Sequence, residues 1–175
     1  MPTNPSIKES NIAKDTEFIT DLSQQDYEPA PKTIYYVDSG TVKALLKGNL
    51  NVKDKFLAHD KAISISQIVR DDLLLEALRA DNQELWEIYK EIFKIYNCWQ
   101  IDQDDYLKKC INLEKECQNK GLNLNWQTIQ ELALCIKGEE DWHWIKTVYI
   151  TSQSVDIFTI INNLRVENWT INSQL

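Results

Sequence analysis

The chain has 175 residues, which is enough for one domain with a substantial core and marginal for two. Its composition, with 43% hydrophobic, 10% aromatic and 26% charged residues, excludes a fully disordered or collagen-like chain. The formal net charge of -8 is opposite in sign to that of proteins that coat nucleic acid electrostatically. A metal nuclease is not excluded, because such a site concentrates carboxylates around divalent ions.

The first 32 residues form a polar, acidic stretch that differs from the rest of the chain. They contain all four prolines, Pro2, Pro5, Pro29 and Pro31. We expect an N-terminal arm over residues 1–32, either disordered or docked, and a domain over residues 33–175. Docking is an alternative because four apolar residues could share one side of a short helix: Ile12, Phe18, Ile19 and Leu22.

The cysteine and histidine content bounds the metal chemistry and the compartment. The four cysteines form no CxxC pair, and the only histidines are His59 and His143, so no zinc ribbon or zinc finger is predicted. We expect buried free thiols in a reducing compartment. The N-terminus lacks the regions of a signal peptide and no apolar run has the length of a membrane span, so we expect a cytoplasmic protein without membrane contact.

The first half of the domain reads as two strands, each followed by a helix. Residues 33–37 are β-branched and aromatic without polar alternation, which is typical of a strand buried on both faces of a parallel sheet. A short helix is expected over 41–47, ending at Gly48. A second strand over 62–65 leads to Ser66, a helix N-cap candidate, and to a helix that runs through Ala80.

Three further helices and two strands are expected after Asp81. The helix over 84–99 has a broad apolar face, the next runs from about Asp102 to Gln118, and the third, around 129–136, is expected to end at Gly138. Strand patterns follow at 147–150 and, more weakly, at 165–171. The alternation predicts the α/β fold class, as a three-layer sandwich with a central, mainly parallel sheet.

Ligands of open parallel sheets bind at the carboxyl ends of the strands. Asp38 and Ser39 follow the first strand, Asp72 lies in the helix after the second strand, and Gln153 follows the third. Carboxylates gathered at one edge repel each other unless they are protonated or bridged by a cation, and Mg²⁺ or Mn²⁺ suits such oxygen ligands. The alternative is that Asp38 only caps a helix and that Asp72 lies on a solvated face.

Five motifs occur in a fixed order along the domain. The first is Ile34-Tyr35-Tyr36-Val37-Asp38-Ser39-Gly40, and in the second Ser66 precedes Asp72 by six positions. The others cover residues 121–136, 149–158 and 164–169. Together they resemble the PIN domain family, the metal-dependent nuclease fold of bacterial toxin-antitoxin toxins and several RNA-processing enzymes.

The resemblance implies a PIN-like fold and a set of site residues. Asp38 and Asp72 would hold Mg²⁺ or Mn²⁺, with Asp72 in place of the usual Glu, while Ser39 and Gln153 would orient water or phosphate. The chain departs from the family at three positions: Trp126 stands where the third carboxylate belongs, Gln153 where Asp or Asn is usual, and Gly40 where a polar residue is common. Asp156 or Glu131 would have to substitute as metal ligand.

Two functions therefore stay open. The first is a toxin-type endoribonuclease with an incomplete carboxylate set. The second is a catalytically degenerate PIN-like domain that acts as a binding or regulatory module. The resemblance implies RNA as substrate, an antitoxin-like protein as partner and a homodimer as a further form of assembly, with the helix over 84–99 as the contact face. An unrelated α/β binding protein is a third class.

Overall fold

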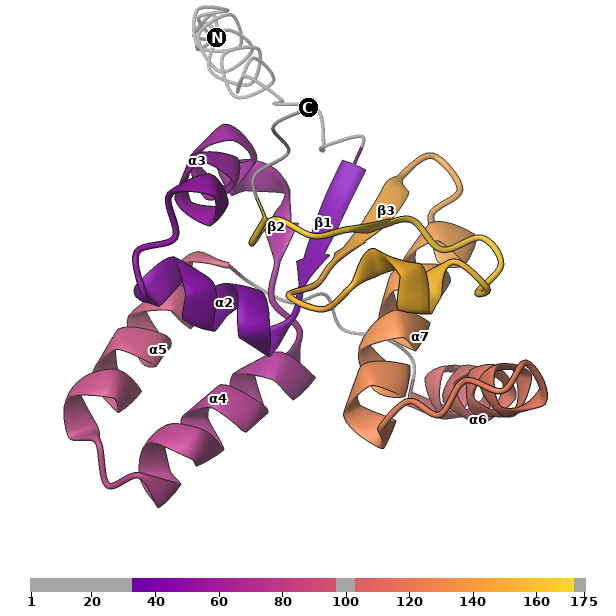
Figure 1. Ribbon diagram of the computed structural model, residues 1–175, viewed down its shortest axis with the longest axis horizontal. Helices are drawn as coiled ribbons and strands as arrows, with labels where there is room; N and C mark the ends of the chain where they lie inside the picture. The colour runs from indigo at the N-terminus through magenta and orange to yellow at the C-terminus, as the bar shows by residue number, and fades with distance from the viewer. Residues whose placement is uncertain (1–32, 97–102, 172–175) are drawn as a thin grey trace, which may run out of the picture. The chain divides into compact units, whose positions relative to one another are not determined.

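The computed structural model describes residues 33–96 and 103–171, so the expected arm over 1–32 lies outside the described residues. The sheet has four strands in the order β2-β1-β3-β4, and every neighbouring pair is parallel (Figure 1). These are β1 (Thr33–Val37), β2 (Ile63–Ser64), β3 (Lys146–Ile150) and β4 (Val166–Glu167). The predicted parallel sheet, with the first two strands as neighbours, is confirmed.

Alternate residues of β1 face two separate hydrophobic cores, as expected for a strand buried on both faces. Ile34 and Tyr36 belong to the core formed with α6 (Gln103–Asn119) and α7 (Trp126–Asp141). Val37 belongs to the core on the other face. That core is formed by α2 (Ser39–Leu46), α3 (Leu50–Ala58), α4 (Gln67–Arg79) and α5 (Gln83–Ile95). The three-layer α/β architecture is therefore confirmed, and none of the described helices is long and apolar enough to cross a membrane.

The third predicted helix ends later than expected. We expected Gly138 to end it, but α7 continues through that residue to Asp141. A Cβ atom at Gly138 would lie 3.1 Å from the Tyr36 hydroxyl oxygen. The glycine therefore allows α7 to lie close to β1, instead of capping the helix.

Two other elements differ from expectation near the C-terminus and in the first half of the domain. The sequence analysis assigned no element to α3, because only Val52 and Phe56 are apolar residues buried in this charged helix. The last strand is limited to Val166–Glu167 instead of extending over 165–171. The following segment is held by side chains: the Asn51 amide donates to the Trp169 carbonyl oxygen at 2.6 Å.

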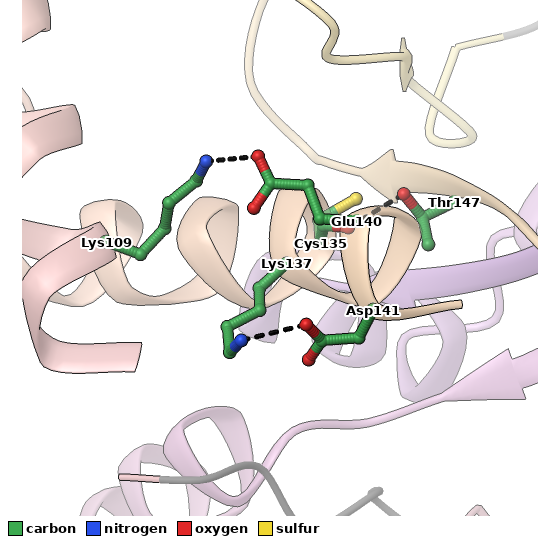
Figure 2. A network of polar contacts seen from close by, with 6 residues as sticks. All are labelled: Lys109, Cys135, Lys137, Glu140, Asp141 and Thr147. Carbon is green, nitrogen blue, oxygen red and sulfur yellow. Dashed lines mark hydrogen bonds and ion pairs between the residues drawn. The ribbon is translucent and has the colours of Figure 1, made fainter. Parts of the chain in front are cut away.

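Helix α7 is fixed from both sides by polar contacts (Figure 2). Lys109 of α6 forms an ion pair with Glu140 of α7. The Thr147 hydroxyl of β3 donates to the Cys135 carbonyl oxygen at 2.8 Å. Because α7 carries Glu131 and Trp126, these contacts fix the position of both residues along the strands of the sheet.

Three of the four cysteines lie in described regions, and all three are buried and unpaired: Cys110, Cys117 and Cys135. The expectation of buried free thiols is confirmed for them. Burial raises the pKa of the Cys135 thiol to about 12. Cys98 lies outside the described residues.

Helix α4 offers a matched test of the packing that holds Asp72 in place. Leu73 is fully buried, whereas Leu78 on the same helix is 58% exposed. We expect Leu73→Ala to lower the free energy of unfolding by about 2–5 kcal/mol, because it removes buried methyl groups and leaves a cavity. Leu78→Ala should change it by about 0.5 kcal/mol or less. Urea unfolding of both variants checks this, and equal losses would contradict the assignment of Leu73 to the core.

Candidate functional site

Asp38 lies directly after β1 and is buried. Its Oδ1 atom accepts a hydrogen bond from the Thr41 backbone N–H at 2.6 Å, so Asp38 is the N-cap of α2. Its Oδ2 atom accepts from the Thr151 hydroxyl at 2.9 Å and from the Ser152 backbone N–H and hydroxyl at 2.9 and 3.2 Å. Asp38 therefore caps α2, but the bonds to Oδ2 go beyond what a cap requires, so capping is not its whole role in the fold.

The pairing of β1 with β3 explains how residues so distant in sequence meet. Val37 is opposite Ile150 in the parallel register, and the Asp38 backbone N–H donates to the Ile150 carbonyl oxygen at 2.9 Å. Residues that follow these two strands therefore leave the sheet at the same edge. Thr151 and Ser152 follow β3 at this edge, beside Asp38.

Gly40 is required by the close approach of Ser152. A Cβ atom at position 40 would lie 1.9 Å from the Ser152 hydroxyl oxygen and 2.8 Å from its Cβ atom. Distances below about 3.0 Å are not tolerated between such atoms. The departure from a polar residue at this position therefore has a steric reason.

Glu131 is a buried carboxyl group on the sheet-facing side of α7, with 5% of its surface exposed. Its Oε2 atom accepts from the Tyr149 hydroxyl at 2.7 Å and its Oε1 atom from the Gln127 amide at 3.0 Å. Burial raises the pKa of Glu131 to about 7, and the charges of Asp38 and Asp72 also raise it. The hydrogen bonds from Tyr149 and Gln127 act in the opposite direction and lower it. Burial and the neighbouring Glu131 also raise the pKa of Tyr149.

Helix α7 runs antiparallel to β3, which places its first residue at the same edge as Asp38. Glu131 contacts Tyr149 and Cys135 contacts Thr147. Residue numbers therefore increase along α7 in the direction in which they decrease along β3. Four helix residues span about 6 Å and two strand residues about 6.6 Å, so four residues along α7 match two residues along β3. Trp126, the first residue of α7, therefore lies near the level of Thr151, with 43% of its surface exposed.

Asp72 contributes a second carboxylate to this region. It is half-buried in α4, and its side chain makes no hydrogen bond or ion pair within residues 33–96 and 103–171. Its charge contributes to the raised pKa of Glu131, as the charge of Asp38 does, so both aspartates lie within electrostatic range of Glu131. The neighbouring Asp71 is exposed and pairs with Arg70 at 3.0 Å, as a residue on a solvated face would.

The remaining predicted residues lie at or near this edge with fewer contacts. Ser39 is the first residue of α2 and is half-buried. Gln153 is exposed; its backbone N–H donates to the Thr151 hydroxyl oxygen at 3.0 Å. Asp156 is exposed in the first turn of η3 (Val155–Phe158). The sequence analysis assigned no role to Thr151 and Ser152, whose signal is their position at the end of β3.

Asp38 and Asp72 are the predicted metal ligands that keep acceptor capacity for a divalent cation, and two carboxylates are too few for a two-metal centre. Among the described residues, no group of three or more His, Cys, Asp or Glu side chains is placed to hold a metal ion. Asp38 Oδ1 accepts only one of the hydrogen bonds to this carboxylate, and the Asp72 carboxylate is unpartnered among the described residues, so both retain acceptor capacity. Both oxygens of Glu131 are already engaged.

The structure is similar to chains of several solved toxin-antitoxin complexes. VapBC2 from Rickettsia felis, bound to a promoter DNA fragment, matches with a TM-score of 0.64 at 20% identity over 78% of this chain and 98% of that one. DNA-bound VapBC from Salmonella typhimurium gives 0.67 at 14% identity, over 78% and 98%. A toxin-antitoxin complex from Klebsiella pneumoniae gives 0.54 at 18% identity, over 74% and 94%.

Neither the protein-family models nor the sequences of curated proteins match this chain. At the identities of the structural matches the similarity concerns the fold. The predicted PIN-like fold is confirmed, and it covers nearly the full length of the matched chains.

Glu131 predicts a specific dependence of stability on pH. Its pKa is about 7 in the folded protein and near 4.5 in a free carboxyl group, so over this range only the folded state keeps the proton. The stability that Glu131 contributes should therefore be fully present below pH 4.5 and be lost as the pH rises towards and through 7, by roughly 3 kcal/mol in total. Glu131→Gln should remove this loss, because the amide cannot ionise.

Urea unfolding between pH 5 and pH 8 measures the effect. Glu84→Gln, at an exposed position in the first turn of α5, is the matched control and should follow the unaltered protein. If the stability of Glu131→Gln declined with pH in parallel with the unaltered protein, Glu131 would have an ordinary pKa.

Proposed function

We propose that this protein is a PIN-like toxin of a toxin-antitoxin pair, with weak endoribonuclease activity that depends on Mg²⁺ or Mn²⁺. The main support is that Asp38 follows β1 and Asp72 lies in α4 of a PIN-like fold, and that the charge of each raises the pKa of Glu131. Two carboxylates beside the partly protonated Glu131 create a negative potential. A divalent cation is the natural counter-charge for such a region and for an approaching RNA phosphate.

The proposed roles follow from the contacts of each side chain. Asp38 and Asp72 would hold the cation, which supplies an activated water and offsets charge on the phosphate. Hydrogen bonds from Thr41, Thr151 and Ser152 hold the Asp38 carboxylate in one orientation.

The residues around this pair would act on the substrate side. Ser39 and Gln153 would orient water or phosphate at the same edge. Glu131 lies deeper and would not be a direct ligand, since both of its oxygens are engaged by Tyr149 and Gln127. Asp156 remains a candidate for an additional contact to the cation, from an exposed position after β3.

The second candidate function is a binding module without catalysis, and Trp126 favours it. The family resemblance implies a carboxylate at this position, but the chain has a partly exposed indole there. An exposed tryptophan can stack on a nucleobase or contact a protein partner. Binding of RNA or protein at this edge would then persist without cleavage.

A protein partner is the other part of the proposal. The matched structures include toxin-antitoxin complexes, and this chain leaves apolar side chains of α5 exposed, with Ile88 and Ile95 seven positions apart on one face. Such a face is typical of a contact surface. We propose that it binds an antitoxin-like protein or a second copy of the chain.

The activity can be tested with a Mn²⁺ titration and cleavage of a structured RNA. We expect weak Mn²⁺-dependent cleavage, because metal affinity follows the number of charged oxygen ligands. Asp38→Asn and Asp72→Asn should abolish it. Asp71→Asn, at the adjacent exposed position, should cleave like the unaltered protein.

The same assay separates the two candidate functions. Cleavage without a divalent cation, or retained by Asp38→Asn, would contradict the nuclease proposal. RNA binding without any cleavage, lost in Trp126→Ala, would support the binding module instead. Trp126→Asp should strengthen Mn²⁺ binding, because it introduces a carboxylate near the level of Thr151.

The contact face on α5 predicts the behaviour of the chain at high concentration. We expect a dimer in sedimentation equilibrium, and Ile95→Lys should weaken it by about tenfold or more, because a charge at a buried contact costs well over 1.4 kcal/mol. Leu57→Lys on α3 is the matched control, since Leu57 and Ile95 are 69% and 71% exposed. A monomer at the highest concentration, or equal effects of both substitutions, would contradict self-association through α5.

A further inference from the structure

The hydroxyl of Ser152 occupies the space that a side chain at position 40 would fill. A Cβ atom at Gly40 would lie 1.9 Å from the Ser152 Oγ atom. The same Oγ atom is 3.2 Å from Asp38 Oδ2 and donates a hydrogen bond to it. The bond from the Ser152 hydroxyl to Asp38 therefore depends on the absence of a side chain at Gly40.

Asp38 accepts four hydrogen bonds, one on Oδ1 and three on Oδ2, so Oδ2 is fully engaged while Oδ1 keeps capacity for a further partner. Three of them are between 2.6 and 2.9 Å, and the bond from the Ser152 hydroxyl is the longest at 3.2 Å. Two of the three shorter bonds come from backbone N–H groups and one from the buried Thr151 hydroxyl. The Ser152 hydroxyl is thus the donor that a substitution can remove with least disturbance of the others.

We propose that Gly40 and Ser152 form a matched pair that weakens the affinity of Asp38 for a divalent cation. Hydrogen-bond donors and a cation draw on the same negative charge, so each donor on the carboxylate lowers what the cation gains. Ser152 is a positioning residue in this sense, since it acts through Asp38. The proposal rests on the proposed function, because Asp38 has to be a cation ligand.

The steric part of the pair is tested by thermal unfolding without any metal. Gly40→Ala should lower the melting temperature by about 5 °C in the otherwise unaltered protein, because Ser152 has to move. In a Ser152→Gly background the same substitution should have a much smaller effect. The nearest remaining atom would be Asp38 Oδ1 at 3.6 Å, an ordinary contact. Equal losses in both backgrounds would show that the two positions are independent.

The effect on the cation is tested by calorimetric titration with Mn²⁺ alone. Ser152→Ala should bind Mn²⁺ about threefold to tenfold more tightly than the unaltered protein, since it removes one charge-assisted hydrogen bond. A merely structural role of Ser152 would give weaker binding instead. Ser154→Ala is the matched control, because Ser154 is exposed and its side chain makes no capping hydrogen bond.

The outcomes separate this inference from the proposed function. Unchanged or weaker Mn²⁺ binding by Ser152→Ala, with Ser154→Ala equal to the unaltered protein, would overturn the inference alone. Equal Mn²⁺ affinity in Asp38→Asn and the unaltered protein would overturn the proposed function, because the cation would not be on Asp38. Absence of binding in both the unaltered protein and Ser152→Ala would overturn both.

Discussion

The carboxylate of Asp38 is the point on which the edge of the sheet depends. It joins the start of α2 to the segment after β3, through bonds to Thr41 on one oxygen and to Thr151 and Ser152 on the other. A buried ionised carboxylate is stable only when its charge is met by such donors. The parallel pairing of β1 with β3 supplies them, because it ends both strands at one edge. Gly40 completes the arrangement by leaving room for Ser152.

The same edge gathers negative charge in a chain that already carries a formal net charge of -8. The Asp38 carboxylate accepts four hydrogen bonds, whereas burial raises the pKa of Glu131 to about 7. These are two different solutions to one electrostatic problem. Asp72 has neither solution among the described residues, which leaves it as the group with most to gain from a cation.

Long, periodic patterns made the main elements predictable. The β-branched run of β1 and the Ser66 cap of α4 lie where the sequence placed them, and the predicted helix over 84–99 is confirmed as far as Ile95, where α5 ends. Helix α3 was missed because two buried apolar residues do not make a periodic pattern, and Gly138 was misread because its packing partner, Tyr36, is distant in sequence. In the site, strand ends identified Asp38 and Gln153. The bonds from Ser152 to Asp38 and from Tyr149 to Glu131 depend on the pairing of β1 with β3 and on the position of α7 along the sheet. No local sequence pattern contains this information.

Trp126 and Glu131 lie on the same helix but occupy different places relative to the site. Five residues advance a helix by about 7.5 Å and turn it by roughly 140°, so the two side chains cannot point to the same place. Trp126 is partly exposed near the edge, while Glu131 lies in a narrow recess lined by Val37, Val69 and Tyr149. In that recess both oxygens of Glu131 are engaged by Tyr149 and Gln127, so it presents no free oxygen at the edge. An acidic residue in the core and an indole near the edge therefore stand five positions apart on one helix, each with a different environment.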